Sequence, residues 1–305
     1  MIILKLLIFN LEMGVKEKKS YLGIYFKGLL MGIADLIPGI SGGTIAFIVG
    51  IYQRLIKSLK NISFTNYFNL FLFFKNRDKK KFREEFLRLD ILFLFILVLG
   101  IFSSILSFSH LISYLLENYL VFLLSFFIGL ILMSSKVIFK EVTNPSKKNL
   151  LFSLIGFIFG FSFIFLPQGL VSNPSFIFVM VGGFLAMFAL FLPGVSGSFI
   201  LLLLGLYEYI INVVKEIQSR FIDLIPFILG AIVGVAVISR LVDFLFRVDK
   251  SKTLLFLLGL VLGSLFVPLK NILELIEFNS FNIVMSLFLF FVGCLVVYLL
   301  EKYGN

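Results

Sequence analysis

KGLLMGIADLIPGISGGTIAFIVGIYQRLIKSL at residues 27–59 and GGFLAMFALFLPGVSGSFILLLLGLYEYIINVV at residues 182–214 are two versions of one segment. They align without a gap, and the alignment pairs Pro38 with Pro193, Ser41 with Ser196 and Tyr52 with Tyr207. Such a match indicates an internal duplication. Weaker matches follow it, so we predict two repeats, at residues 21–168 and 176–301. Each repeat has one Pro-Gly-broken segment followed by three uninterrupted apolar segments.

The composition excludes a water-soluble protein. Hydrophobic residues make up 60% of the 305 residues, charged residues only 14%, and the mean hydropathy is +1.10. An ordinary soluble domain has roughly a quarter charged residues. Six apolar runs are about long enough to cross a bilayer. They lie at residues 91–108, 120–135, 150–166, 224–239, 254–269 and 281–300. We therefore predict an all-α integral membrane protein with a single membrane domain over residues 1–305.

The Pro-Gly pair should interrupt the helix in each duplicated segment. Proline lacks a backbone donor and clashes with the preceding turn, and glycine favours non-helical backbone. In the first repeat the helix is expected to stop near Leu36 and to resume at Gly42 to Thr44. Each helical piece is then about 14 residues, or about 21 Å, which is too short to cross the membrane. The segment is either a re-entrant hairpin or one kinked spanning helix.

The distribution of positive charge favours the hairpin. With re-entrant segments, all but three of the 27 Lys and Arg residues lie in the cytoplasm, as the positive-inside rule requires. The three exceptions are Lys215, Arg220 and Lys270. A spanning segment would place the cation-rich loop from Arg54 to Arg88 outside. We therefore predict six spanning helices in the cytoplasmic membrane and both termini in the cytoplasm. The two hairpins would enter from opposite faces, and this inverted repeat is typical of secondary transporters.

The remaining charges fit a membrane protein. The net charge is +10, but the basic residues lie beside hydrophobic segments, where they act as topology signals and contact anionic lipid, so no nucleic-acid partner is expected. Residues 61–90 combine an aromatic stretch with a dense run of cations, which predicts an amphipathic cytoplasmic loop on the inner leaflet. The single cysteine, Cys294, excludes a thiolate metal cluster. No metal or other cofactor is expected.

Small hydroxyl-rich turns follow both breaks and open new helices. A helix start exposes unpaired N–H groups, glycine lets a ligand approach the backbone, and hydroxyl groups add donors. Two such starts facing each other would make an anion-binding site for phosphate or carboxylate. Alternatively, the small residues serve only close helix packing. The candidate binding residues are Ser41, Gly42, Gly43, Thr44, Ser196, Gly197 and Ser198, and the helix-breaking residues are Pro38, Gly39, Pro193 and Gly194.

Other polar residues have more than one candidate role. Asp35 precedes the first break, and Leu190 stands at the equivalent place in the second repeat. Its carboxyl group either carries a coupling proton, pairs with a cation, or bonds to backbone. Arg240 either contacts a phosphate headgroup or anchors its helix at the interface. His110 is expected in a short external turn. Tyr52 and Tyr207 either hydrogen-bond a ligand or lie in the aromatic belt, and the belt is the favoured position.

The strings PGISGGT with GIY and PGVSGS with GLY resemble a family of prokaryotic membrane proteins described as polyprenyl-phosphate transporters. The resemblance covers about residues 22–301. It implies recycling of undecaprenyl phosphate, the lipid carrier of cell-wall precursors, from the outer to the inner leaflet. It also implies roles in that activity for Asp35 and for the break and turn residues of both repeats. The phosphate would bind at the breaks while the tail stays in lipid.

Two other classes of function share these features. A membrane lipid-pyrophosphate phosphatase also uses re-entrant Ser-Gly loops, but it needs an acid, base or nucleophile near them. Here the only histidine is remote from both breaks in sequence, so an enzyme is not expected. A channel or secondary transporter for a small soluble anion would use the same binding site. The coupling ion, the direction of transport and the oligomeric state stay open at this level.

Overall fold

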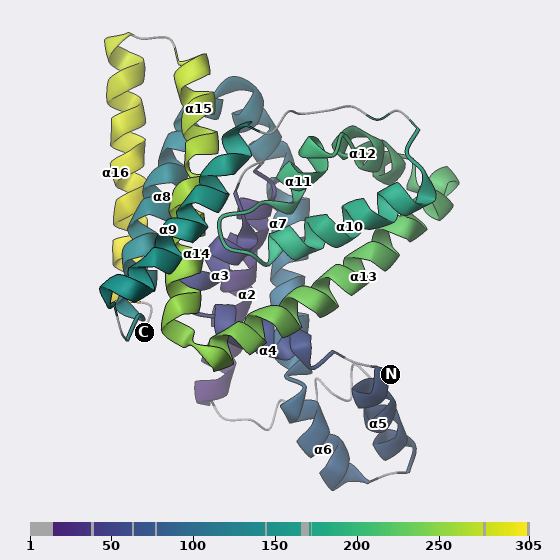
Figure 1. Ribbon diagram of the computed structural model, residues 1–305. Coiled ribbons are helices and arrows are strands. Elements are labelled where there is room, and N and C mark those ends of the chain that lie inside the picture. Colours follow the sequence, from purple (N-terminus) through teal and green to yellow (C-terminus); the bar gives the residue numbers. More distant parts are fainter. Residues whose placement is uncertain are drawn as a thin grey trace.

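The computed structural model describes residues 15–37, 40–62, 64–76, 78–143, 145–165, 171, 173–276 and 279–303, and every regular element in these ranges is helical (Figure 1). The first repeat contains α2 (Val15–Asp35), α3 (Gly42–Ile48), α4 (Tyr52–Lys60), α5 (Phe64–Lys75), α6 (Lys79–Arg88), α7 (Ile91–Asn118), α8 (Leu120–Lys140), α9 (Lys147–Ser162) and the short 3-10 helix η1 (Phe163–Phe165). The second contains α10 (Phe176–Leu190), α11 (Gly197–Leu203), α12 (Tyr207–Lys215), α13 (Ile217–Val248), α14 (Lys250–Ser264), α15 (Phe266–Leu275) and α16 (Ser280–Tyr303).

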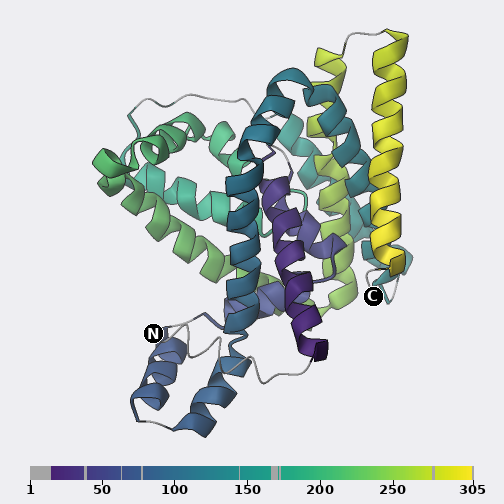
Figure 2. The same ribbon diagram turned by 180° about the vertical axis from the view of Figure 1, so that it is seen from behind.

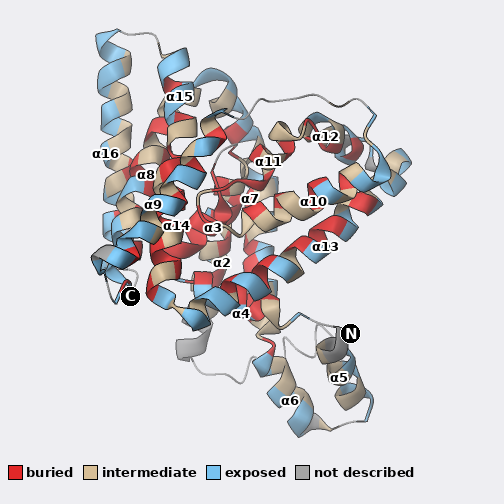
Figure 3. Ribbon diagram, in the orientation of Figure 1, coloured by how far each residue is buried: buried red, intermediate tan, exposed pale blue. Residues whose placement is uncertain are grey.

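Six helical stretches of the described chain are long and apolar enough to cross a membrane. They coincide with the six apolar runs of the sequence, which confirms a multi-pass helical membrane protein. Their outward faces are apolar, and Leu106 and Ile222 are each 77% exposed. Figure 3 shows buried residues gathered where the helices meet at the centre. The six stretches are Ile91–Asn118, Leu120–Lys140, Lys148–Phe165, Gln218–Val248, Lys250–Leu275 and Ser280–Leu299.

The long helices pack in four pairs, and two of these pairs join the repeats. Within each repeat the broken segment packs on the first spanning helix, α2 on α7 and α10 on α13. The other two pairs each join a helix of one repeat to a helix of the other: α8 packs on α16, and α9 packs on α14. Figure 2 shows α2 (purple) beside α7 (blue) from behind. The fold is therefore a single interlocked bundle in which neither repeat completes its own packing.

Glycines allow the helices of these pairs to approach closely. A Cβ atom on Gly129 of α8 would overlap the backbone oxygen of Phe290 on α16, and one on Gly293 would overlap that of Phe126. In the α9–α14 pair, a Cβ atom on Gly259 would overlap the oxygen of Ser153. Small residues at helix contacts are the usual means of tight packing in membranes, where lipid removes the hydrophobic drive for association.

Both predicted helix breaks are present. Helix α2 ends at Asp35 and α3 begins at Gly42, while α10 ends at Leu190 and α11 begins at Gly197. Pro38 and Gly39 lie outside the described residues. In the second break, Gly194 has a φ of +87°, a left-handed conformation that glycine adopts at no steric cost.

Each broken segment also bends a second time, which the sequence analysis missed. Gly50 and Gly205 have φ values of 71° and 70°, and they separate α3 from α4 and α11 from α12. The two helices on either side of Gly205 meet at 116°. The expectation of one continuous helix after each Pro-Gly pair was therefore wrong, because a glycine in an apolar run is compatible with either a helix or a left-handed turn.

The predicted turn at His110 is wrong as well. His110 is an exposed residue inside α7, which continues to Asn118. The apolar residues after His110 recur with helical spacing, so they extend the helix beyond the polar positions that suggested a turn.

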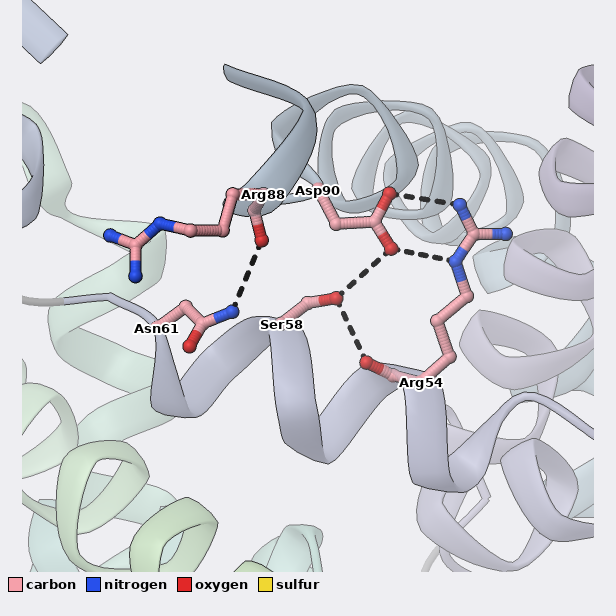
Figure 4. A network of polar contacts seen from close by, with 5 residues as sticks. All are labelled: Arg54, Ser58, Asn61, Arg88 and Asp90. Carbon is pink, nitrogen blue, oxygen red and sulfur yellow. Dashed lines mark hydrogen bonds and ion pairs between the residues drawn. The ribbon is translucent and has the colours of Figure 1, made fainter. Parts of the chain in front are cut away.

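The α5–α6 hairpin projects from one end of the bundle (Figure 1). Figure 4 shows how the C-terminal end of α6, next to the bundle, is tied to α4. Arg54 donates two hydrogen bonds to Asp90, of 2.6 and 2.8 Å, and Ser58 bonds the same carboxylate at 3.3 Å. Asn61 donates to the backbone oxygen of Arg88 at 3.2 Å. These contacts fix the junction between α6 and α7 against α4.

Ion pairs at the same end connect α4 to helices of both repeats. Lys60 pairs with Asp243 of α13 at 2.5 Å, and Arg247 shares that carboxylate at 2.9 Å. Glu141, after α8, accepts from Gln53 and pairs with Lys250 of α14. The cation-rich helix ends of both repeats therefore gather at one end of the bundle.

We expect Gly129→Leu to destabilise the fold, because the larger side chain must force α8 and α16 apart. Overpacking at a tight contact costs about 1–3 kcal/mol or more. Thermal unfolding of the purified protein in detergent should show a lower midpoint. Gly23→Ala is the matched control, because a Cβ atom there meets nothing within 4 Å, and it should leave the midpoint unchanged or slightly higher. Equal midpoints for Gly129→Leu and wild type would contradict the glycine packing.

Candidate functional site

The two breaks lie against each other at the centre of the bundle. The backbone N–H of Gly194, in the second break, donates to Thr44 Oγ1 at 2.8 Å. Ser41 Oγ donates to the carbonyl oxygen of Leu190 at 3.2 Å. Thr44 is fully buried and Ser41 is 1% exposed. The side chains at the start of α3 therefore satisfy backbone groups that the second break leaves open.

The helix start at α3 is capped by its own chain. Asp35 Oδ1 accepts from the N–H of Gly42 at 2.7 Å, and Ser41 Oγ accepts from the N–H of Gly43 at 3.1 Å. Ser41, Gly42, Gly43 and Thr44 are all buried. The N–H groups expected to bind an anion are thus already paired in this conformation, and of the three roles considered for Asp35, the bond to backbone is the one seen.

The helix start at α11 is different. Ser196 makes no capping hydrogen bond with its side chain, and its Oγ lies 2.7 Å from that of Ser198. In the ungapped alignment of the repeats, Ser198 corresponds to Gly43, so only the second start has a hydroxyl group at this position. The two turns that the sequence suggested were alike are chemically distinct.

A cavity of about 330 Å³ opens beside the α11 start. Most of its lining is apolar and comes from α10, α11, α12 and the facing side of α13, all in the second repeat. The polar lining residues are Asp35, Ser198 and Tyr207. The first repeat contributes Asp35 and Leu36 alone. The cavity therefore lies between the end of α2 and the second repeat, at the breaks.

The tyrosines after the breaks are not both in an aromatic belt. Tyr52 is 2% exposed, stacks on Phe47 at 3.9 Å, and donates to the carbonyl oxygen of Phe191 at 2.8 Å. Tyr207, its counterpart, lines the cavity. The belt expectation is therefore wrong for Tyr52. The repetition of tyrosine at equivalent places in GIY and GLY was the signal that could have indicated a role at the breaks.

Several predicted site residues lie elsewhere. Arg240 is exposed on α13, and its Nη1 donates to the carbonyl oxygen of Ala236 at 2.8 Å. It does not line the cavity. Pro193 and Gly194 form the second break itself, and Gly197 lines the cavity beside Ser198. The structure thus brings together Asp35, Gly197 and Ser198 and leaves Arg240 apart.

We expect Thr44→Val to destabilise the protein, because it removes the acceptor for the buried Gly194 N–H and keeps the volume of the side chain. An unsatisfied buried backbone group costs about 1–3 kcal/mol. The midpoint of thermal unfolding in detergent should fall for Thr44→Val and stay near wild type for Thr44→Ser, which retains the hydroxyl group. A wild-type midpoint for Thr44→Val would show that this contact does not hold the breaks together.

Comparisons with known proteins identify one family and two relatives. A family model described as VCA0040-like, undecaprenyl phosphate translocase-like, matches residues 31–283. A polyprenyl-phosphate transporter of Vibrio cholerae serotype O1 is 39% identical over 246 residues, which cover 81% of this chain and 77% of the relative. A polyprenyl-phosphate transporter of Staphylococcus aureus is 27% identical over 288 residues, covering 88% and 92%. No solved structure matches the chain.

The family match covers both breaks and the cavity, and the first relative aligns with most of the chain at well above 30% identity. The resemblance expected from PGISGGT and PGVSGS is thereby confirmed. The chain belongs to the VCA0040-like, undecaprenyl phosphate translocase-like family of membrane proteins.

Proposed function

We propose that this protein transports a polyprenyl phosphate, the undecaprenyl carrier of cell-wall precursors, across the cytoplasmic membrane so that it is recycled. The cavity between the repeats is the observation that carries the proposal, because it lies at the breaks and combines an apolar lining with a few polar groups. The names of the two relatives support a lipid phosphate as the substrate and favour transport over catalysis.

The headgroup would bind beside the start of α11. The hydroxyl groups of Ser198 and Tyr207 are donors in the cavity wall, and the glycine at position 197 lets an oxygen approach the backbone. A volume of about 330 Å³ accommodates a phosphate but not a long isoprenoid chain. The tail would therefore remain in lipid while the headgroup crosses, and the apolar outer faces of the helices offer it a path.

Asp35 would couple the headgroup to a proton or a cation. An ionised carboxylate and a phosphate in one cavity of low polarity repel each other strongly. Protonation of Asp35, or a cation beside it, removes this repulsion and lets the headgroup enter. The carboxyl group is well placed for this role, since it lines the cavity and is held by the Gly42 N–H.

The two repeats would be inverted, with each broken segment forming a re-entrant hairpin. The pairs α8–α16 and α9–α14 support this proposal, because they map onto each other when the repeats are interchanged. The cation-rich end that carries α4, α5 and α6 would be cytoplasmic, by the positive-inside rule. The headgroup site would then lie near the middle of the membrane, where it can be opened to either side.

Transport can be tested in liposomes with a short-chain fluorescent polyprenyl phosphate. Ser198→Ala removes a donor to a charged group, worth about 1.5–3 kcal/mol, and should slow movement roughly ten-fold or more. Asp35→Asn keeps the shape of the side chain but cannot release a proton, so transport should lose its dependence on an imposed proton or cation gradient. Ser162→Ala, at an exposed serine of α9, is the control and should transport like wild type.

The same liposomes separate the alternatives. Movement of the lipid that needs the protein and falls in Ser198→Ala supports the proposal. No movement of the lipid, with transport of inorganic phosphate or a small organic anion, would assign the protein to soluble-anion transport. Release of phosphate from the lipid would assign it to the phosphatases.

The α5–α6 hairpin would lie on the anionic inner leaflet. Its helix α5 exposes a stripe of Phe68, Phe71 and Phe74, which are 47%, 57% and 51% exposed and recur every three residues. The adjacent helix α6 is rich in lysine and arginine. An apolar stripe beside cations is the pattern of helices that rest in the headgroup region.

We expect Phe71→Trp to place a fluorophore in the membrane interface. The chain contains no tryptophan, so the substitution provides a single reporter. Lipids with brominated acyl chains should quench it, and more strongly when the vesicles contain anionic lipid. Phe82→Trp is the matched control, because Phe82 packs against Phe74 and Phe86 inside the hairpin, and it should be quenched less. Equal quenching at the two positions would contradict a bound hairpin.

A further inference from the structure

The residues that line the cavity have counterparts in the first repeat. The alignment of residues 27–59 with residues 182–214 pairs Tyr207 with Tyr52, Ile211 with Ile56 and Leu201 with Ala46. It also pairs Leu36, on the opposite wall, with Phe191. The lining of the cavity therefore defines an equivalent set of residues around Tyr52.

That equivalent set is closed. Ala46 is fully buried, and Tyr52, Leu55 and Ile56 are 2%, 3% and 2% exposed. Their counterparts Leu201, Tyr207, Ile210 and Ile211 all line the open cavity. Leu201 and Ile210 are themselves only 7% exposed, whereas Tyr207 and Ile211 are partly exposed. The contrast between packed core and cavity wall therefore lies at the Tyr52–Tyr207 and Ile56–Ile211 positions.

One of the hydrogen bonds between the repeats marks this difference. Tyr52 donates to the carbonyl oxygen of Phe191 across the boundary between the repeats. The equivalent bond would run from Tyr207 to the carbonyl oxygen of Leu36. Tyr207 and Leu36 both line the cavity, so this bond would run across the space that is open in this structure.

The helices that carry the tyrosines pack differently to match. Helix α4 lies on α13 of the other repeat, where Lys60 pairs with Asp243. Its counterpart α12 packs on α11 and α13 of its own repeat. Helix α4 therefore packs on the other repeat, whereas α12 packs on its own repeat.

We infer that the protein contains a second phosphate-headgroup pocket, closed in this structure and lined by Gly42, Ala46, Tyr52, Leu55, Ile56 and Phe191, and that the two pockets open alternately. When Tyr52 leaves Phe191 and α4 leaves α13, this pocket opens. When Tyr207 bonds Leu36, the cavity around Ser198 closes. Packed interfaces of this kind change between two discrete arrangements, not continuously. The inference rests on the proposed function for the identity of the ligand alone.

Asp35 would line both pockets. The repeat alignment pairs Asp35 with Leu190, and both residues line the open cavity. The second pocket is defined by replacing each lining residue with its counterpart in the other repeat. This replaces Asp35 by Leu190 and Leu190 by Asp35, so both residues would line the second pocket as well. A single carboxyl group would then face the headgroup in both states, which accounts for an acidic residue in one repeat only.

Thiol labelling can follow the two pockets without any substrate. In a Cys294→Ser background, Ile211→Cys and Ile56→Cys place matched cysteines in the open and the closed pocket. A polar maleimide, supplied on both sides of reconstituted vesicles, should label Ile211→Cys and spare Ile56→Cys. Adding Tyr52→Phe removes one hydrogen bond from the present state, so labelling of Ile56→Cys should rise about three- to ten-fold while that of Ile211→Cys falls.

Two further variants, Tyr207→Phe and Asp243→Asn, test whether the Tyr52 bond and the Lys60 ion pair hold the second pocket closed. Tyr207→Phe lacks the same hydroxyl group but has no bond to lose here, so Ile56→Cys should stay protected. Asp243→Asn lies away from the breaks and releases Lys60, and it should shift labelling in the same direction as Tyr52→Phe. A rise at Ile56→Cys without a fall at Ile211→Cys, or no rise in either variant, would overturn the alternating pockets.

The labelling result is independent of the transport assay. Reciprocal labelling without movement of polyprenyl phosphate would leave the two pockets in place and overturn the lipid substrate. Movement of polyprenyl phosphate without reciprocal labelling would leave the proposed function in place and overturn the second pocket.

Discussion

Broken backbone inside a hydrophobic bundle must find hydrogen-bond partners within the protein, and the rest of this structure depends on that constraint. Lipid offers no partner, so an unpaired N–H or C=O group there costs several kcal/mol. Here side chains of the first repeat satisfy backbone groups in the break of the second. Thr44 accepts from Gly194, Ser41 donates to Leu190, and Tyr52 donates to Phe191. The two repeats are therefore joined at the breaks in their helices.

These bonds between the repeats are one-sided, and the cavity lies on the side that lacks them. All three bonds run from side chains of the first repeat to backbone of the second. The start of α3 is buried and is capped by Asp35 and Ser41, whereas the start of α11 borders an open space with Ser198 and Tyr207 in its wall. A duplicated sequence has thus folded into an unequal pair, and an open space with polar groups in its wall lies beside the second break.

The helix pairs around the breaks provide a rigid frame. Helices α8 and α16, and α9 and α14, approach closely because glycines replace side chains at their contacts. The ion pair of Lys250 with Glu141 ties α14 to the end of α8. The movement that the proposed function requires would then fall on the short helices on either side of Gly50 and Gly205, which are α3, α4, α11 and α12.

Much of the fold was predictable from sequence. The six apolar runs correspond to the six long helices, and the PGISGGT and PGVSGS strings correctly placed the ends of α2 and α10 and the starts of α3 and α11. These features depend on local chemistry: hydrophobic length and the geometry of proline and glycine. The sequence also singled out Asp35, Gly197 and Ser198, which the structure brings to one cavity.

The rest depended on contacts between distant segments. A repeat in sequence suggests equal roles for equal residues, so nothing in it indicated that Tyr52 is buried while Tyr207 lines the cavity. The bends at Gly50 and Gly205 were not predicted, because glycine is also tolerated within a helix. The capping of Gly42 by Asp35 needs the chain to turn back through a break whose path the sequence does not specify. The charge of Arg240 was compatible with either a phosphate contact or an interfacial anchor, and its position on α13 keeps it out of the cavity lining.

The most direct test of the central claim is a cryo-EM structure of the protein in lipid nanodiscs with a short-chain polyprenyl phosphate bound. Our account predicts density for the phosphate in the cavity, within hydrogen-bond distance of Ser198 or Tyr207 and close to Asp35, with the isoprenoid tail leading outward into lipid. Density for the phosphate at the outer surface of the bundle, with the cavity between the repeats empty, would contradict it.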